Sequence, residues 1–254
     1  MKIIKNIGLR DLIDELLFDD QSPLNIAGRI NKHEQQLPNI SKDSIYRYIE
    51  SVYGRNIEYH RQKRKARRHR HRAKNKKLND RVFIDKRPKS VNLRQKIGHG
   101  EADFIASGKS GKGILLVVVE RKTRNTFLEK IMKVNINNVH QSFVKIKERF
   151  PEMKTITTDN DLLFQKHKEL EELLKIKIYF CHPYHSWEKG TVENVNKHIR
   201  QDIPKGSDIS KYSKKFIQQL EIKLNRRILA CLNYLTPAEA LQLERKTKKR
   251  SCVS

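Results

Sequence analysis

The stretch GILLVVVE, residues 113–120, decides the fold class, because its six central residues are all apolar and three of them are Val. β-branched residues favour strands, and an unbroken apolar run indicates a strand with both faces buried. The run is far too short to cross a bilayer, which needs about 20 apolar residues in a helix. It therefore predicts an inner strand of an α/β protein, with other elements packed on both sides of the sheet.

The sequence around this run predicts a mixed sheet of five strands. One strand is expected before the run, another after a tight turn, and two more alternate with helical segments. The expected strands cover residues 100–108, 113–120, 123–132, 154–159 and 177–184, and expected helices cover 135–150, 164–176 and parts of 211–245. Three consecutive strands followed by strand–helix crossovers are the order expected of an RNase H-like fold.

Residues 9–49 predict a small all-α domain before the sheet. Apolar residues recur at helical spacing in 9–19, Ser22 and Pro23 form an N-cap and first-turn signature, and Ser41 caps a further helix. A short helix, a turn and a second capped helix fit a helix-turn-helix unit whose second helix enters the DNA major groove. A three-helix bundle that binds nothing is the alternative. The outward-facing candidates for DNA contact are Lys42, Ser44 and Arg47.

The charge of the chain favours nucleic acid as a partner. Lys and Arg number 55 against 29 acids, a formal net charge of +26, and the excess is shared between residues 1–92 (+12) and 93–254 (+14). Residues 61–77 hold eleven Lys/Arg and no acid, a composition that cannot form a core. The segment is a solvated linker, or a linker that lies along phosphates, and the two interpretations are compatible. Its candidate DNA contacts are Arg64, Arg67, Arg68, Arg70 and Arg72.

Three acids fall where the predicted sheet would bring them together. Asp103 lies in the middle of the first strand, Asp159 closes the fourth strand, and Glu193 lies in a helical pattern after the fifth. Crowded carboxylates repel one another unless a cation is bound, and Mg²⁺ prefers oxygen ligands. Two such ions can activate a nucleophile and stabilise a leaving oxygen in phosphodiester transfer. The acids alone are a weak signal, but their strand-end placement and basic surroundings strengthen it.

Other residues offer competing chemistry. Glu101 shares the strand face of Asp103 and is a lower-ranked candidate ligand. His182 and His185, within CHPYH, resemble metal ligands, but the sequence has no second half at zinc spacing, so we do not expect zinc. The three cysteines lack metal spacing and are expected to be reduced thiols. With no signal-peptide pattern at its start, the chain is expected to be cytoplasmic and free of membrane segments.

Seven stretches, in order, carry a resemblance to a known family. They are SPLNIAGRI (22–30), ISKDSIYRYI (40–49), VNLRQKIGHGEAD (91–103), VVERKTRNT (118–126), TTDN (157–160), HPYHSWEKGTVENVNKHIRQDIPKGSD (182–208) and LNRRILACLNYLTPAEAL (224–241). On these stretches the chain resembles DDE transposases of the insertion-sequence 30 family, within the retroviral-integrase superfamily. The resemblance runs from about residue 9 to residue 243, which is nearly the whole chain.

The resemblance implies an RNase H-like core that uses two Mg²⁺ ions, with Mn²⁺ as a substitute, to cut insertion-sequence ends and transfer a 3′ hydroxyl to target DNA. The family's acidic triad maps onto Asp103, Asp159 and Glu193. Its basic residue two turns after the Glu maps onto Arg200. Further DNA contacts are expected from Lys189, Asn194 and Lys197. The resemblance also implies at least a dimer on DNA, in the cytoplasm of a bacterium and associated with its nucleoid.

The expected domains are a helix-turn-helix domain at 1–56, a basic linker at 57–92, the catalytic core at 93–245 and a basic tail at 246–254. The sequence departs from the family at Gly100, where a Trp is usual, and at Asp161, where a Gly is usual. The first departure predicts a packing defect and the second adds a carboxylate beside the acids. The family also usually carries another helical DNA-binding segment upstream. A decayed or truncated transposase that only binds DNA, and a nuclease with the same core, are therefore the alternatives.

Overall fold

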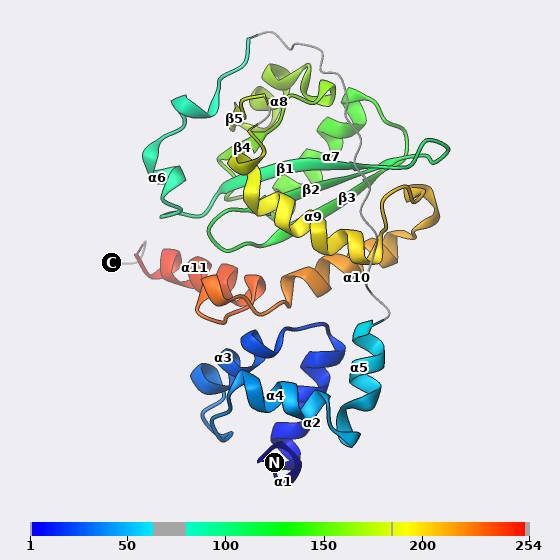
Figure 1. Cartoon of the computed structure of the whole chain (residues 1–254). Coiled ribbons are helices and arrows are strands. Elements are labelled where there is room, and N and C mark those ends of the chain that lie inside the picture. The colour runs from blue at the N-terminus through cyan, green and yellow to red at the C-terminus, as the bar shows by residue number, and fades with distance from the viewer. Residues whose placement is uncertain (1, 63–79, 184, 252–254) are drawn as a thin grey trace. The chain divides into compact units, whose positions relative to one another are not determined.

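The structure is a computed structural model that describes residues 2–62, 80–183 and 185–251. The chain divides into two compact units (Figure 1). The sheet unit is Arg70–Asn225, and the helical unit combines Met1–His69 with Arg226–Ser254. Each unit has a hydrophobic core of its own.

The sheet unit is built on five strands. β1 (His99–Ala106), β2 (Ile114–Glu120) and β3 (Thr126–Ile131) form an antiparallel meander, while β4 (Thr155–Thr158) pairs with β1 in parallel and β5 (Lys177–Phe180) pairs with β4 in parallel. The order across the sheet is β3-β2-β1-β4-β5. This mixed sheet confirms the predicted RNase H-like fold. All seven residues of β2 are buried, as its apolar run predicted.

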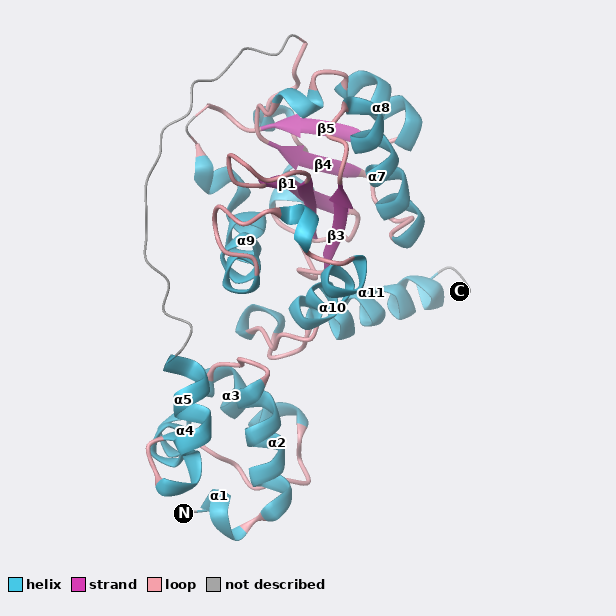
Figure 2. Cartoon of the chain, turned by 90° about the vertical axis from the view of Figure 1, so that its right-hand side faces the viewer, coloured by secondary structure: helices cyan, strands magenta, loops and turns pink. Residues whose placement is uncertain are grey.

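Helices cover both faces of the sheet (Figure 2). α7 (Ile136–Arg149) and α8 (His167–Leu174) pack on one face, and α9 (Gly190–Asp202) and α10 (Lys214–Asn225) pack on the other. A short helix, α6 (Lys89–Asn92), precedes β1. The α9 and α10 face carries one continuous apolar core of Ile105, Leu115, Val117, Val119, Leu128, Val192, Ile199, Ile203, Ile209, Ile217, Leu220 and Leu224. Burying such a side chain stabilises by about 1.5–3 kcal/mol, so this core fixes α9 on the sheet.

The register of the sheet brings the acids of β1 and β4 side by side. In the parallel pair of β1 and β4, Glu101 lies opposite Thr157. Two residues further along both strands, Asp103 and Asp159 therefore run next to each other, with Asp159 just beyond the end of β4. Side chains alternate between faces, so Asp103 shares the face of Ile105, which lies in the core beneath α9.

Among the residues that the structure describes, the helical unit has five α-helices in its N-terminal part and a sixth in its C-terminal part. They are α1 (Lys2–Lys5), α2 (Ile7–Phe18), α3 (Pro23–His33), α4 (Lys42–Ile49), α5 (Arg55–Gln62) and α11 (Pro237–Ser251). Ser22 Oγ accepts the backbone N–H of Asn25, and Ser41 Oγ accepts that of Ser44, so both predicted N-caps are present. Ile45, Tyr48 and Ile49 of α4 face inward, as their spacing predicted. The all-α N-terminal region is thus also as the sequence predicted.

The C-terminal segment packs against α3 within the helical unit. A Cβ on Gly28 would lie 2.0 Å from the ring of Tyr234, so only glycine allows this close approach. Arg29 donates two hydrogen bonds, of 2.8 and 2.9 Å, to the carboxylate of Glu239, 210 residues away. The structural boundary at residue 225 therefore differs from the sequence-based one at 245, because contacts so distant in sequence decide it.

Candidate active site

Asp103 points from the middle of β1 toward α9. Its Oδ2 accepts a hydrogen bond of 2.7 Å from Asn196 Nδ2, and its Oδ1 lies 3.2 Å from Lys189 Nζ. Burial raises the pKa of Asp103, the ammonium of Lys189 lowers it, and the nearby Asp159 raises it again, with a net upward shift. Asp103 is therefore a partly buried acid that meets a second carboxylate, as the sequence predicted.

Asp159 supplies that second carboxylate from the end of β4. Its Oδ2 lies 3.1 Å from the same Lys189 Nζ, so one ammonium joins both aspartates. Its Oδ1 is buried and has no hydrogen-bond partner among the residues that the structure describes. A buried carboxylate oxygen without a partner is costly, and such an atom is suited to serve as a cation ligand.

Glu193 reaches the same cavity from the first turn of α9. Burial raises the pKa of Glu193, Lys189 lowers it, and Asp103 raises it further, so that the net shift is upward. The cavity has a volume of about 330 Å³ and is lined by Asp103, Asp159, Asn160, Asp161, Cys181, His182, Pro183, His185, Lys189 and Glu193. The structure thus brings together three acids that are far apart in the sequence; their catalytic role stays a prediction.

Lys189 has a position that the sequence did not anticipate. Its side chain is only 6% exposed, and its ammonium lies between Asp103 and Asp159. Burial lowers the pKa of Lys189, but the two carboxylates outweigh that effect and leave the pKa above its usual value. In this arrangement Lys189 neutralises the two aspartates, and its expected contact with DNA stays a prediction. A cation already bridges two of the three acids.

This donor set fits a hard divalent cation. The three carboxylates offer only oxygen atoms, which are the ligands that Mg²⁺ prefers. Two of these oxygens already lie at 3.1–3.2 Å from one positive group, and another buried oxygen on Asp159 has no partner in the described part of the chain. The residues that could hold the ions are therefore Asp103, Asp159 and Glu193.

The two departures from the family have different structural outcomes. Asp161 lines the cavity, and its Oδ1 accepts the backbone N–H of Leu163 at 2.9 Å. Burial raises the pKa of Asp161 and Asp159 adds to the rise, so it is an extra acid at the site. At Gly100, an added Cβ would lie 2.8 Å from Ile156 Cδ1, so the expected packing defect is absent and Ile156 fills the space.

Glu101 links β1 to the start of α9 beneath the site. It is almost fully buried, and its Oε1 accepts from Arg121 Nε at 3.0 Å. Its Oε2 accepts the backbone N–H groups of Thr191 and Val192 at 2.9 and 3.0 Å, at the start of α9. An acid at a helix N-terminus is stabilised by the helix dipole. Glu101 is thus a structural link between β1 and α9, and Arg121 pairs with it rather than with the adjacent Glu120, which accepts from Thr123.

The predicted DNA-contacting residues of α9 lie along its outer side. Asn194 and Lys197 are exposed, and Arg200 is half-buried. Burial lowers the pKa of Arg200, and the charge of Asp103 partly counteracts this effect. In α4, Lys42 and Arg47 are exposed and Ser44 is half-buried. Arg64, Arg67, Arg68, Arg70 and Arg72 lie outside the described residues.

Cys181 and Trp187 lie in the segment between β5 and α9. Burial raises the pKa of Cys181 to about 12, so this cavity-lining residue is a thiol and a poor nucleophile at neutral pH. Among the described residues, Cys181 and Cys231 are free thiols. Trp187 is 70% exposed and stacks on His185 with ring centroids 4.4 Å apart.

Comparisons with known proteins give a consistent picture. The chain is 38% identical over 238 residues to the transposase for insertion sequence element IS4351 of Bacteroides fragilis, covering 91% of this chain and 72% of that protein. It is 32% identical over 238 residues to the transposase for IS1086 of Cupriavidus metallidurans (88% and 70%). It is 28% identical over 252 residues to the transposase InsI for IS30A of Escherichia coli (94% and 65%).

These relatives define the class of protein, the DDE polynucleotidyl transferases. Within that class the chain belongs to the insertion-sequence 30 family of transposases. It spans 65–72% of the length of the three relatives. Among solved structures, the catalytic core domain of BIV integrase is similar with a TM-score of 0.47 and 18% identity, covering 60% of this chain and 98% of that one. No protein-family model matches the chain.

Membrane insertion finds no support in the described helices, none of which combines the length and the apolar composition that a bilayer span requires.

Proposed function

We propose that this chain cuts DNA at insertion-sequence ends and joins the resulting 3′ ends to target DNA. The observation that carries the proposal is that Asp103, Asp159 and Glu193, from three separate elements, line one cavity. Support also comes from the relatives, which are transposases, and from their class, which generally uses divalent metal ions.

The three acids would hold two Mg²⁺ ions, for which Mn²⁺ is a substitute. When bound, the ions would activate the attacking oxygen and stabilise the leaving oxygen of the phosphodiester. Asn196 positions the first acid, because its amide holds Asp103 Oδ2 while Oδ1 meets Lys189 in the cavity wall. Glu101 positions the third acid, because it binds the first amides of the helix that carries Glu193.

DNA would be held on several surfaces of the chain. Asn194, Lys197 and Arg200 follow Glu193 along α9, where they would contact phosphates near the cavity. In the helical unit, Lys42, Ser44 and Arg47 lie on the solvent side of α4, which would enter the major groove. The net charge of +26 supports binding through released counterions. We propose that the protein acts on DNA as an oligomer. We also propose that it is associated with the nucleoid in the cytoplasm of a bacterium.

A DNA-binding protein without catalysis is the second candidate. The observation that favours it is the ammonium of Lys189 between Asp103 and Asp159, where it competes with divalent ions for the same oxygens. In that case the chain would occupy element ends and exclude an active transposase from them.

A strand-transfer assay with a pre-nicked element end separates these functions. The full chain is incubated with labelled end DNA and a target plasmid, once with Mg²⁺ and once with EDTA. Joined product that requires Mg²⁺ supports the transposase, and binding without chemistry supports the second candidate. Cleavage without joining would indicate a nuclease and would contradict the proposal.

The matched variant is Asp159→Asn, which keeps the size of the side chain and removes its charge. We expect joining to be abolished and binding of end DNA to stay within about threefold of the original, because the residue would hold metal rather than DNA. Equal losses of joining and binding would contradict the assigned role of Asp159.

A further inference from the structure

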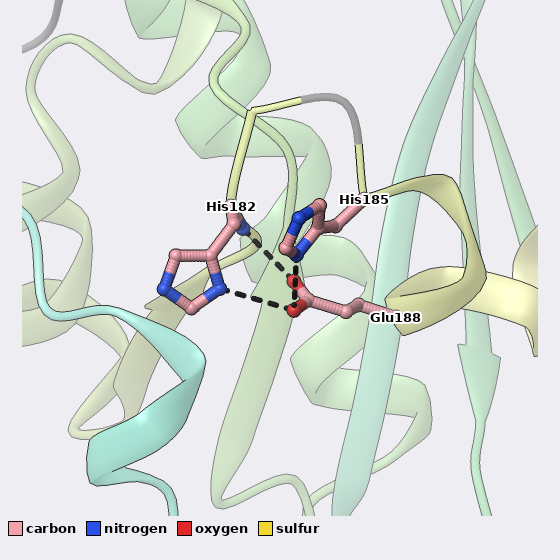
Figure 3. A group of neighbouring side chains, drawn as sticks. All are labelled: His182, His185 and Glu188. Carbon is pink, nitrogen blue, oxygen red and sulfur yellow. Dashed lines mark hydrogen bonds and ion pairs between the residues drawn. The ribbon is translucent and has the colours of Figure 1, made fainter.

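The loop between β5 and α9 brings two imidazoles to one carboxylate oxygen. Glu188 Oε1 lies 3.0 Å from His182 Nδ1 and 3.3 Å from His185 Nδ1 (Figure 3). The three atoms that could serve as ligands all lie within 4.8 Å of one another. His182 and His185 also line the cavity of the acids, whereas Glu188 is not among the lining residues.

Two of the three spacings are close to those of a zinc site. Zinc binds His nitrogen and carboxylate oxygen at about 2.0–2.1 Å, and in a tetrahedron this puts neighbouring ligand atoms about 3.3–3.4 Å apart. The two measured separations, 3.0 and 3.3 Å, are close to that edge length. A single ion could therefore be held by small movements of the side chains.

The three side chains are also held in orientation. Glu188 Oε2 accepts the backbone N–H of His182 at 2.8 Å, which turns Oε1 toward the imidazoles. The ring of Phe83 stacks on His182 with centroids 5.2 Å apart and an interplanar angle of 8°. Trp187 stacks on His185 in the same way, at 4.4 Å and 25°. The stack gives the exposed Trp187 a structural role in the loop, because it restricts the rotation of the His185 ring.

A further carboxylate lies against the other ring nitrogen of His182. His182 Nε2 lies 2.8 Å from Asp85 Oδ2, before β1 in the chain. A His that ligates metal almost always donates its other N–H to such a partner. With the proton on Nε2, the Nδ1 lone pair faces Glu188 Oε1 at 3.0 Å, an arrangement that needs a cation or a second proton between the two atoms.

We propose that His182, His185 and Glu188 bind one first-row transition-metal ion, of which Zn²⁺ is the best match, at a site separate from the three acids. Two imidazoles and one carboxylate favour Zn²⁺, whereas the all-oxygen set beside them favours Mg²⁺. The ligands follow the spacing His-x₂-His-x₂-Glu within seven residues. The ion closes the loop that leads into Lys189 and α9, and so fixes one wall of the cavity.

Titration with Co²⁺ alone tests this site, because tetrahedral Co²⁺ absorbs visible light far more strongly than octahedral Co²⁺. The full chain is prepared without an affinity tag, stripped of metal and titrated. We expect one equivalent of tetrahedral Co²⁺, displaced by Zn²⁺. In His185→Gln, whose side chain is partly exposed, the band is lost while the circular dichroism is retained. Asp85→Asn weakens Zn²⁺ binding about 10–100-fold.

Two control variants separate this site from other donors. Glu193→Gln alters the acidic site and leaves the Co²⁺ band unchanged. The double change His69→Gln and His71→Gln removes histidines of the basic segment and also leaves the band unchanged. The proposal is overturned if the original chain gives no tetrahedral band, if His185→Gln retains it, or if either control abolishes it. None of these outcomes depends on transposase activity.

Discussion

The backbone N–H of Thr191 donates to Glu101 Oε2 over 2.9 Å, so the strand that carries Asp103 and the helix that carries Glu193 share one buried carboxylate. The N–H of Val192 donates to the same oxygen, and Arg121 neutralises the other one. Arg121 in turn donates to the carbonyl oxygen of Val91. The geometry of the acids therefore depends on a residue that is itself outside the cavity lining.

Replacing Glu101 by Gln removes the charge that compensates Arg121. Breaking a buried ion pair from one side costs about 3–5 kcal/mol, because the other charge stays buried. We expect the free energy of unfolding of the sheet unit, measured by urea denaturation, to fall by that amount. The backbone amides of Thr191 and Val192 should also exchange hydrogen faster. The control is Asp80→Asn, which breaks the exposed pair with Lys168 and should change stability by about 1 kcal/mol or less. Equal effects of the two changes would contradict the structural role of Glu101.

Replacing Lys189 by Gln removes the ammonium that competes with divalent ions. We expect the affinity for Mg²⁺, measured by calorimetry, to rise about tenfold, which corresponds to about 1.4 kcal/mol. The control is Lys197→Gln on the exposed side of α9, for which a change of no more than about twofold is expected. Unchanged Mg²⁺ affinity in the Lys189 variant would mean that this lysine does not compete. If the slope of log K for DNA binding against log salt instead became shallower by about 1, the predicted phosphate contact would be supported.

Replacing the five arginines of the basic segment by Gln tests whether that segment touches DNA. The slope of log K against log salt is negative, and each lost phosphate contact makes it shallower by about 0.9, so five lost contacts should make it shallower by up to about 4.5. The changes are made at Arg64, Arg67, Arg68, Arg70 and Arg72, and the slope is measured by fluorescence anisotropy. Replacing Lys166, Lys168, Lys175 and Lys177 by Gln lowers the net charge elsewhere and serves as control. The same slope in the arginine variant and the original chain would exclude the contact.

His99 makes stability depend on pH. Burial lowers the pKa of His99 from 6.5 to about 4, and the charges of Lys154, Arg121 and Arg87 add to the effect. The unfolded chain takes up this proton near pH 6.5 and the folded chain only near pH 4. The stability that neutral His99 contributes is therefore fully present above pH 6.5 and is lost as the pH falls toward 4. His99→Gln, which can still bond to Thr155, should flatten the fall in urea midpoint across this window; parallel curves would rule the effect out.

Local signals in the sequence predicted the fold well. The apolar run of β2 and the N-caps Ser22 and Ser41 depend on neighbouring residues, and the order of strands limits the topology. The convergence of Asp103 and Asp159 follows from adjacent parallel strands. The place of Lys189 could not be predicted, because it depends on a loop geometry that turns a basic side chain inward. The grouping of Glu188 with His182 and His185 was not considered, because zinc spacing was sought in pairs of ligand pairs, whereas these three side chains lie within one loop.

The grouping of Arg226–Ser254 with the helices was likewise beyond local reasoning. The spacing of apolar residues in α3 does not show that Gly28 packs against the ring of Tyr234. It also does not show that Arg29 forms an ion pair with Glu239. Both contacts join residues more than 200 positions apart, and a single sequence carries no signal for them.

Because segments on both sides of the sheet unit build the helical unit, the sheet unit is an insertion within it. During translation, α3 is synthesised before the sheet unit, whereas its partners Tyr234 and Glu239 are synthesised after it. A stop codon directly after residue 225 would spare all three acids and still remove Glu239 from Arg29. Loss of the residues that follow the sheet unit would thus first affect a helix that precedes it.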